Sequence, residues 1–264
     1  MEKLLFTAIQ ASLKAGEEIL KVYDSDFSVE HKADNSPVTL ADKNAHNAIC
    51  EILKETNFPT LSEEGEIIDF SERSQLEYFW MVDPLDGTKE FVKRNGEFTV
   101  NIALIHQQKS ILGVIYVPVT KTLYFAAQGI GAFKLEFQTA YSESYNLETL
   151  LKLSEKLPLK RGKRKFTIVA SRSHLSEKTE MFIEGLITTN KEVDFISSGS
   201  SIKLCLVAEG SADVYPRFAP TMEWDTAAGQ AIVENSGKQV IDYSTNKVLL
   251  YNKENLLNNW FVVK

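Results

Sequence analysis

The segment WMVDPLDGTKEF, residues 80–91, places two acidic side chains directly after an apolar run. Asp83 and Asp86 are separated by Pro84 and Leu85, and the proline ring fixes one backbone dihedral angle between them. The two carboxylates and the Leu85 carbonyl can therefore face one point with little loss of conformational entropy. Asp-Pro and Asp-Gly are also common turn dipeptides, so this pair on its own favours an ordinary turn.

The residues that follow add an anion-binding feature to the acidic pair. Gly87 and Thr88 come next, and a glycine with free backbone N–H groups at a helix start suits an anionic phosphate. Other carboxylates fall at expected element ends beside apolar strands, where burial is costly without a partner, water or a cation; they are Asp42, Glu63, Glu64 and Asp225. Carboxylate oxygens suit Mg²⁺, which is often shared with substrate phosphates. The pattern predicts a magnesium site that binds a phosphate group.

Composition narrows the class of protein. The chain has 264 residues, 44% hydrophobic and 25% charged, which is typical of a globular protein with one large or two small domains. The formal net charge of −7 argues against nucleic acid as a partner, because such binders neutralise phosphates with dense lysine and arginine. Cys50 and Cys205 lie far apart in apolar contexts, so we expect reduced core thiols and neither a disulfide nor a zinc site.

Two helices and an antiparallel sheet are expected in the first half of the chain. Residues 1–24 carry apolar side chains near helical spacing with charges throughout, which is typical of an amphipathic helix and of neither a signal peptide nor a membrane span. Residues 39–54 begin with Thr39 and Asp42 in the spacing of a capping box. Apolar runs rich in β-branched and aromatic residues predict antiparallel strands at 78–83, 98–105 and 110–119.

The second half alternates strand-like and helix-like segments, which indicates an α/β organisation. The strand-like stretches are 166–171 and 193–197, and the helix-like stretches are 177–188, 200–212 and 225–237. A polar, cation-rich segment at 138–165 is the best candidate for an interdomain crossover, and its basic cluster is expected to be a solvated loop. We therefore expect an N-terminal α+β domain at 1–150 and a C-terminal α/β domain at 151–264.

Three segments together resemble the signature of a known family. SEEG at 62–65, DPLDGTKEF at 83–91 and WDTAAGQAIVENSG at 224–237 are similar to the three motifs of the inositol monophosphatase superfamily, the lithium-sensitive, magnesium-dependent phosphatases. The resemblance spans nearly the whole chain in order and implies an α+β fold, a layered α-β-α-β-α sandwich. One departure is Lys238 after Gly237, where the family usually has a second glycine; it affects a helix end and not the metal site.

The resemblance implies a set of metal ligands. Glu63, Asp83 and the Leu85 carbonyl would hold one Mg²⁺. Asp83, Asp86 and Asp225 would hold a second ion, and the family uses two or three in all. Alternatively, Asp225 is only the N-cap of the helix expected at 225–237.

The resemblance also implies a catalytic pair. Thr88 and Asp42 would orient and deprotonate an attacking water beside the ion held by Glu63, with no covalent intermediate. Without the resemblance, we would expect Thr88 to be a helix cap and Asp42 to be part of a capping box. Glu64 is expected outside the set of ligands or facing solvent.

Residues 197–217, SSGSSIKLCLVAEGSADVYPR, resemble more specifically the 3'(2'),5'-bisphosphate nucleotidases of the CysQ type within that superfamily. Inositol-cleaving relatives have a carboxylate at about the place of Arg217, and the guanidinium here favours a second phosphate. His174 would face an adenine, although a single histidine is more often a surface or cap group. Lys203 has the alternative of an ordinary helix surface position. The residues implied to contact substrate are Gly87, Thr88, His174, Ser200, Lys203, Arg217 and Asp225.

The expected activity is hydrolysis of adenosine 3',5'-bisphosphate to AMP and phosphate, with this small molecule as the partner. Two alternatives stay open: an inositol or sugar phosphate phosphatase on the same scaffold, and a non-catalytic protein that binds magnesium or a nucleotide. The last has no need of the pair formed by Thr88 and Asp42. The expected location is the cytoplasm, or peripherally the cytoplasmic face of the inner membrane, and the sequence leaves the oligomeric state open.

Overall fold

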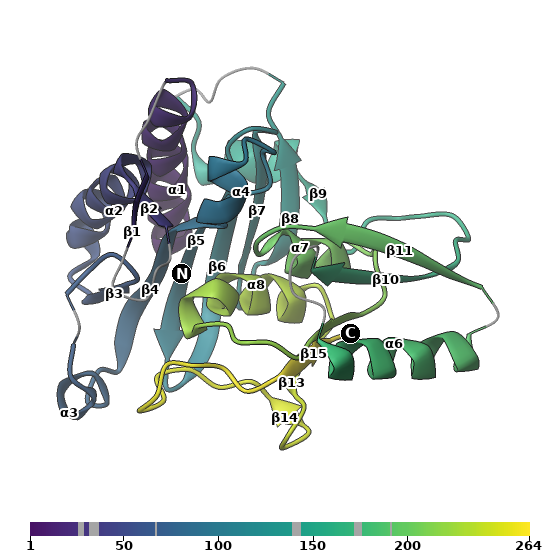
Figure 1. The fold of residues 1–264 in the computed structure, drawn as a ribbon. Coiled ribbons are helices and arrows are strands. Elements are labelled where there is room, and N and C mark those ends of the chain that lie inside the picture. The colour runs from purple at the N-terminus through teal and green to yellow at the C-terminus, as the bar shows by residue number, and fades with distance from the viewer. Residues whose placement is uncertain (26–28, 32–36, 67, 139–143, 172–175, 191) are drawn as a thin grey trace.

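A seven-stranded sheet forms the centre of the protein (Figure 1). The computed structural model describes residues 1–25, 29–31, 37–66, 68–138, 144–171, 176–190 and 192–264. β3 runs parallel to β4, and all later neighbours pair antiparallel, which confirms the antiparallel sheet expected from the apolar runs. In sheet order the strands are β3 (Thr60–Ser62), β4 (Tyr78–Asp86), β5 (Thr99–His106), β6 (Lys109–Val117), β7 (Thr122–Ala127), β8 (Gly131–Glu136) and β9 (Glu155–Lys156).

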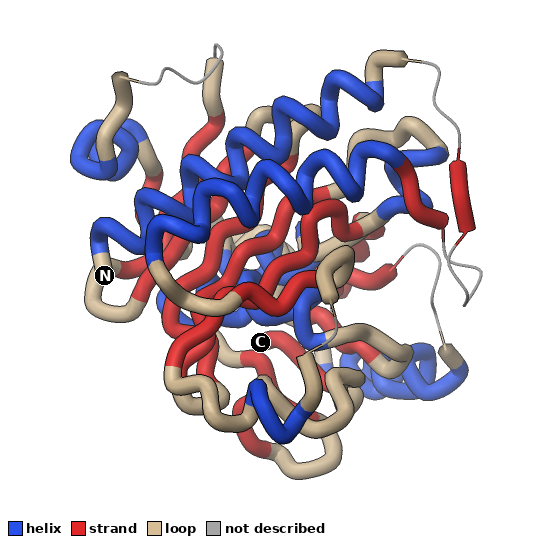
Figure 2. Tube along the Cα trace, turned by 90° about the vertical axis from the view of Figure 1, so that its left-hand side faces the viewer, coloured by secondary structure: helices blue, strands red, loops and turns tan. Residues whose placement is uncertain are grey.

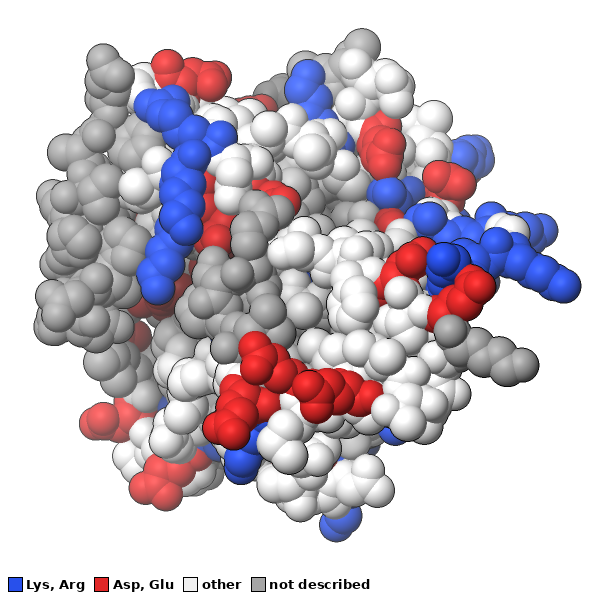
Figure 3. Space-filling view, turned by 45° about the vertical axis from the view of Figure 1, so that its right-hand side comes forward, with Lys and Arg blue, Asp and Glu red and all other residues white. Residues whose placement is uncertain are grey.

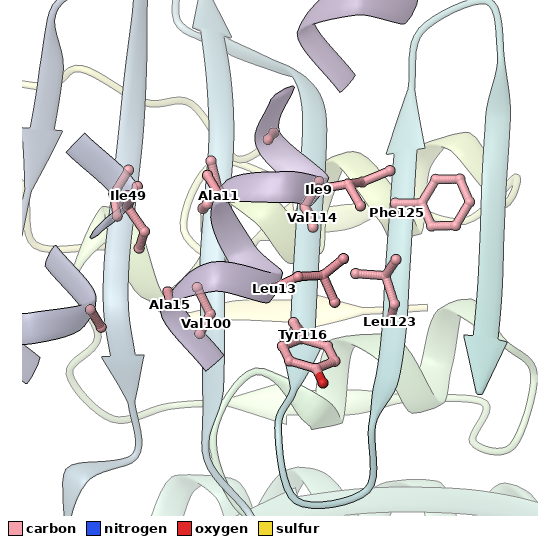
Figure 4. Packing of buried hydrophobic residues seen from close by; sticks show 14 of the residues in the cluster. Ile9, Ala11, Leu13, Ala15, Ile49, Val100, Val114, Tyr116, Leu123 and Phe125 are labelled. Carbon is pink, nitrogen blue, oxygen red and sulfur yellow. The ribbon is translucent and has the colours of Figure 1, made fainter. Parts of the chain in front are cut away.

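Two long helices cover one face of this sheet, α1 (Glu2–Tyr23) and α2 (Leu40–Leu53). They lie side by side across the strands (Figure 2). Ile9 and Leu13 of α1 point into an apolar layer with Val114 and Phe125 of the sheet (Figure 4). The expected helix at 39–54 is confirmed, because Thr39 is its N-cap and forms the capping box with Asp42.

The opposite face is covered by α7 (Ile202–Ala208) and α8 (Glu223–Asn235). Gly113 allows α8 to lie directly on β6, because an added Cβ there would be 2.1 Å from the Ala228 carbonyl oxygen. The helix expected at 225–237 begins two residues earlier, since Asp225 accepts the Met222 N–H from inside the first turn. Asp225 is therefore not the N-cap, and that alternative is wrong.

A second layer of strands lies beyond α7 and α8. β10 (Phe166–Ser171) and β11 (Val193–Ser198) are parallel to each other, and they confirm the strands expected at 166–171 and 193–197. An antiparallel sheet that the sequence did not predict follows, in the order β12 (Tyr215–Arg217), β15 (Phe261–Val263), β13 (Val240–Asp242) and β14 (Lys247–Val248). Each of these strands has three residues or fewer, too short to show a period.

α6 (Glu177–Thr189) packs on the outer side of this layer (Figure 1). Its Ile183 joins a small apolar cluster with Ile168 and Val214. The order of layers is helices, sheet, helices, sheets and helix, which confirms the α-β-α-β-α sandwich. Shorter elements complete the described chain: β1 (Val29–His31), β2 (Pro37–Thr39), the 3₁₀ turn η1 (Lys54–Thr56), α3 (Phe70–Arg73), α4 (Thr88–Val92) and α5 (Leu147–Leu153). A division near residue 150 stays a prediction.

The surface charges do not form one broad basic area on the face drawn in Figure 3, where Lys and Arg side chains gather in separate patches with acidic side chains beside them. In the basic segment expected to be a solvated loop, Arg161 pairs with Glu209 and Arg164 with Asp213. Of the helices in the described ranges, none is long and apolar enough to cross a bilayer.

Candidate active site

A cavity of about 240 Å³ lies where the end of β4, the loop after β11 and the start of α8 meet. Predicted residues from distant parts of the sequence line it together: Glu63, Asp83, Leu85, Asp86, Gly87, Thr88, Ser200, Lys203, Arg217 and Asp225. Asp42 is hydrogen-bonded to the wall through Thr88. His174 lies outside the described residues. The set implied by the three motifs is thus brought to one place.

The acidic pair lies on a bulged strand end. β4 continues through Asp86, and its pairing shifts so that Asp83 faces Asn101 while Asp86 faces Thr99. Three steps along β4 match two along β5, which is the geometry of a β-bulge and turns the end of the strand. The strand runs through the Asp-Pro dipeptide, so the turn that the dipeptides favoured is present as a bend within the strand end and as the turn at Gly87. Asp83 Oδ1 accepts the Leu85 N–H at 3.1 Å, which fixes its carboxylate against the bulge.

Carboxylate oxygens of Glu63, Asp83 and Asp225 lie within 4.8 Å of one another. Glu63 follows β3, whose parallel pairing with β4 sets Ser62 opposite Val82 and so places the next residues, Glu63 and Asp83, side by side. Asp225 comes from the first turn of α8. Asp83 is 1% exposed, whereas Glu63 and Asp225 keep part of their surface open.

The carboxylates raise one another's proton affinity. Burial, then the charges of Glu63 and Asp86, hold the pKa of Asp83 well above its ordinary value. Burial and the same neighbouring charges also raise the pKa of Asp225. For Asp86, burial raises the pKa to about 6, although Lys203 and a backbone hydrogen bond from Ser201 oppose the shift. Clustered hard oxygen donors that repel one another fit a divalent cation such as Mg²⁺.

Thr88 and Asp42 form the expected pair. Thr88 Oγ1 donates to Asp42 Oδ1 at 3.2 Å and also lies 3.3 Å from the Leu85 carbonyl oxygen. Asp42 Oδ2 accepts both the N–H and the hydroxyl of Thr39 at 2.7 Å each. Asp42 is thus part of a capping box and also a partner of Thr88. The cap interpretation of Thr88 is wrong, because Gly87, at φ 93°, is the N-cap of α4.

Burial raises the pKa of Asp42 to about 6, and the hydrogen bonds from Thr39 oppose this shift. Asp42 is 3% exposed, so its carboxylate has little contact with bulk water. The side chain is consequently a fixed hydrogen-bond acceptor behind Thr88.

The other wall of the cavity is cationic. Lys203 is 5% exposed, so the alternative of a helix surface position is wrong. Burial lowers its pKa to about 8, while the charge of Asp86 opposes the shift. Arg217 Nη2 donates to the Pro220 carbonyl oxygen, and its Nε is buried without a partner among the described residues. Two positive groups therefore line the cavity together with the carboxylates.

Sequence reasoning missed the residues that hold Asp86. Asp86 Oδ2 accepts the Ser201 N–H at 2.6 Å and lies 3.4 Å from Asn101 Nδ2. The Ser201 hydroxyl in turn donates to Asn101 Oδ1 at 2.7 Å. A signal was present, because Asn101 interrupts the apolar run at 98–105 and a buried amide needs partners.

Residues 1–262 match the sequence profile described as the inositol monophosphatase family. The chain belongs to this family. Within it, the 3'(2'),5'-bisphosphate nucleotidase CysQ of Salmonella typhimurium is 42% identical over 264 residues, which cover 98% of this chain and 99% of that protein. The nucleotidase CysQ of Escherichia coli strain K12 is 41% identical over the same shares of the two chains.

Solved structures of the inositol monophosphatase family agree with the fold. The crystal structure of CysQ from Bacteroides thetaiotaomicron has a TM-score of 0.93 and 52% sequence identity, covering 100% of this chain and 97% of that one. The Thermotoga maritima IMPase has a TM-score of 0.73 at 22% identity and covers 100% of this chain and 92% of that one. The second likeness supports the layered fold alone.

Proposed function

We propose that this member of the inositol monophosphatase family is a magnesium-dependent 3'(2'),5'-bisphosphate nucleotidase that hydrolyses adenosine 3',5'-bisphosphate to AMP and phosphate. The relatives with that printed name are 41–42% identical over 98% of the chain. The observation that carries the proposal is one cavity with clustered carboxylates as well as the cations of Lys203 and Arg217. Such a cavity suits a substrate with two separated phosphates.

The residues proposed as metal ligands all line the cavity, and three of them, Glu63, Asp83 and Asp225, have carboxylate oxygens within 4.8 Å of one another. Glu63, Asp83 and the Leu85 carbonyl would hold one Mg²⁺. Asp83, Asp86 and Asp225 would hold the second, with Asp83 shared by both. Mg²⁺, when bound, supplies a Lewis acid that polarises the phosphate and lowers the pKa of a water molecule. Its charge also offsets the repulsion among the carboxylates, which lets a phosphate enter an acidic cavity.

The pair of Thr88 and Asp42 handles the proton of the attacking water. The Thr88 hydroxyl already donates to Asp42, so its oxygen has lone pairs left to accept a hydrogen bond from water. As the water oxygen bonds to phosphorus, the bond from phosphorus to the 3'-oxygen breaks; a proton of the water moves to Thr88 Oγ1 while the hydroxyl proton moves to Asp42 Oδ1. The leaving 3'-oxygen takes a proton from solvent water and becomes the hydroxyl of AMP. Thr39 keeps Asp42 in place through two hydrogen bonds to the other carboxylate oxygen.

The cationic wall gives the preference for a bisphosphate. A guanidinium binds phosphate through paired, charge-assisted hydrogen bonds, and Arg217 Nε has no partner among the described residues. The buried Ser200 hydroxyl is likewise without a partner there. Both groups line the cavity and would bind the phosphate that is not cleaved. Contact of His174 with the adenine and of Gly87 with the reacting phosphate stay predictions.

A phosphate-release assay tests this function. Adenosine 3',5'-bisphosphate and inositol 1-phosphate are compared with Mg²⁺, without Mg²⁺, and with added Li⁺. We expect fast, magnesium-dependent release from the bisphosphate, inhibited by lithium. Asp86→Asn, which keeps an oxygen for the Ser201 N–H, should abolish release while the circular dichroism spectrum is unchanged. A preference for inositol 1-phosphate would replace the proposal with the sugar phosphatase alternative, and no hydrolysis at all would favour a binding protein.

A further inference from the structure

Residues 198–201 comprise the last residue of β11 and the loop that joins it to α7. They line the cavity and are held by carboxylates at two backbone N–H groups. Ser201 N–H donates to Asp86 Oδ2 at 2.6 Å. Gly199 N–H donates to Glu97 Oε2 at 2.8 Å. Asp86 is a proposed metal ligand. Glu97 has no role in the function proposed above.

The same loop is held in an unusual backbone conformation. Ser200 has φ 42°, in the left-handed region that is uncommon for residues other than glycine. Lys203 Nζ donates to the carbonyl oxygens of Ser198 and Ser200, at 3.2 Å and 2.6 Å. A conformation of this kind persists only where surrounding contacts hold it. These contacts keep the Ser200 hydroxyl, which has no partner within the described part of the chain, in the wall of the cavity.

Glu97 contacts the loop closely. It lies in the segment between α4 and β5, and an added Cβ on Gly199 would be 2.8 Å from its carbonyl oxygen and 2.9 Å from Cγ of Glu90. Of the described residues, the cavity lining includes Glu90 but not Glu97. A negative charge near an anion site weakens anion binding by its charge alone. Any favourable effect of Glu97 on a phosphate must therefore act through the groups that it contacts or faces, which are the loop and the Lys203 ammonium.

We propose that Glu97 is a positioning residue for the second phosphate, an inference that rests on the proposed function. Its carboxylate holds Gly199 N–H, and this keeps Ser200 and Lys203 in the arrangement that binds the uncleaved phosphate. The hydrogen bond from Gly199 favours binding of the uncleaved phosphate, whereas the direct effect of the negative charge disfavours it. Two variants of Glu97 can therefore separate these effects. Glu97→Gln keeps an oxygen acceptor and removes the charge, whereas Glu97→Ala removes both.

The test combines kinetics with hydrogen exchange on the full chain. For Glu97→Ala we expect KM for adenosine 3',5'-bisphosphate to rise roughly tenfold, with kcat and the KM for adenosine 3'-phosphate changed by less than about threefold. Exchange of backbone amides in a peptide that covers residues 198–201 should accelerate. Glu97→Gln should stay near the wild type in both measurements, or bind the bisphosphate slightly better. Unchanged exchange in Glu97→Ala, or equal rises of KM for both substrates, would overturn the proposal.

Two further variants make the result specific. Asp242 holds the N–H groups of Ser244 and Thr245 in the hairpin between β13 and β14, so Asp242→Ala loses the same kind of bond away from the cavity and should leave both KM values unchanged. If Glu97→Ala does not fold, Gly199→Ala forces the loop away from Glu97 and should give the same kinetic pattern. Should the proposed function fail, the wild type would show no preference for the bisphosphate, and the specificity role would fall with it. Amide exchange would still report whether Glu97 holds the loop.

Discussion

Thr88 and Asp42, 46 residues apart in the sequence, are joined by a hydrogen bond of 3.2 Å from the threonine hydroxyl to Asp42 Oδ1. The bond links the first residue of α4 to the first turn of α2. Asp42 serves both elements, since its other oxygen closes the capping box with Thr39. A local folding signal and the proton acceptor of the proposed reaction are therefore the same carboxylate.

Removing the threonine hydroxyl should slow the chemical step. In Thr88→Ala we expect kcat to fall by at least about 100-fold, because the relay from water to Asp42 is lost. Thr88→Ser retains a hydroxyl and should recover most of the rate. Steady-state kinetics with the bisphosphate and Mg²⁺ measure this, and thermal unfolding serves as the control for folding. An alanine variant with the wild-type kcat would remove Thr88 from the mechanism.

Arg217 should act on substrate preference more than on rate. Arg217→Ala is expected to raise KM for adenosine 3',5'-bisphosphate by about tenfold or more, since a paired, charge-assisted contact is lost. KM for adenosine 3'-phosphate, which has no second phosphate, should change little. The ratio of kcat/KM for the two substrates measures the effect. An equal loss on both would mean that Arg217 supports the cavity in general and does not select the bisphosphate.

Metal binding should stabilise the fold more at neutral than at acidic pH. The pKa of Asp86 is about 6 in the folded chain against an ordinary 3.8, and Asp83 and Asp225 shift in the same direction. The folded state then binds more protons between these values, so the stability of the metal-free protein falls as pH rises through them. The carboxylates repel one another once they have lost their protons, and bound Mg²⁺ offsets this repulsion. At low pH, Mg²⁺ must compete with protons for the same oxygens.

Thermal unfolding in MgCl₂ and in EDTA checks this dependence. The rise in Tm caused by Mg²⁺ should be clearly larger at about pH 7.5 than at about pH 5. Asp86→Asn, which removes one of the repelling charges, should show a smaller rise. A Tm at about pH 7.5 that does not respond to Mg²⁺ would contradict the cation-binding role of the cluster.

Gly113 should be required for the close packing of α8 on the sheet. Gly113→Ala places a Cβ 2.1 Å from the Ala228 carbonyl oxygen, so the helix that carries Asp225 must move. We expect a loss of about 1–3 kcal/mol in the free energy of unfolding, measured with urea. Gly185→Ala is the matched control, because no described residue lies within 4 Å of its Cβ position on α6 and alanine is the better helix former. Equal stability of both variants would argue against the close contact.

Part of this structure could be predicted from local signals. The capping box of α2 and the apolar strands β4 to β6 follow from short-range chemistry, and the structure has them. The family motifs predicted that the acidic residues share one site, and in the structure these residues line one cavity. The β-bulge at Asp83 and Asp86 could not be predicted, because it depends on pairing with a strand later in the chain. Nor could the bond from Ser201 to Asp86, which spans 115 residues.

The proposed reaction requires divalent cations among the carboxylates of Glu63, Asp83, Asp86 and Asp225. Crystals soaked in MnCl₂ and measured for anomalous scattering test this directly, since Mn²⁺ accepts the same oxygen ligands as Mg²⁺ and can be located by its signal. We predict anomalous peaks in the cavity, one in contact with oxygens of Glu63 and Asp83 and a second in contact with oxygens of Asp83, Asp86 and Asp225. A map with no peak in the cavity, or with peaks only elsewhere on the protein, would contradict metal binding by these residues.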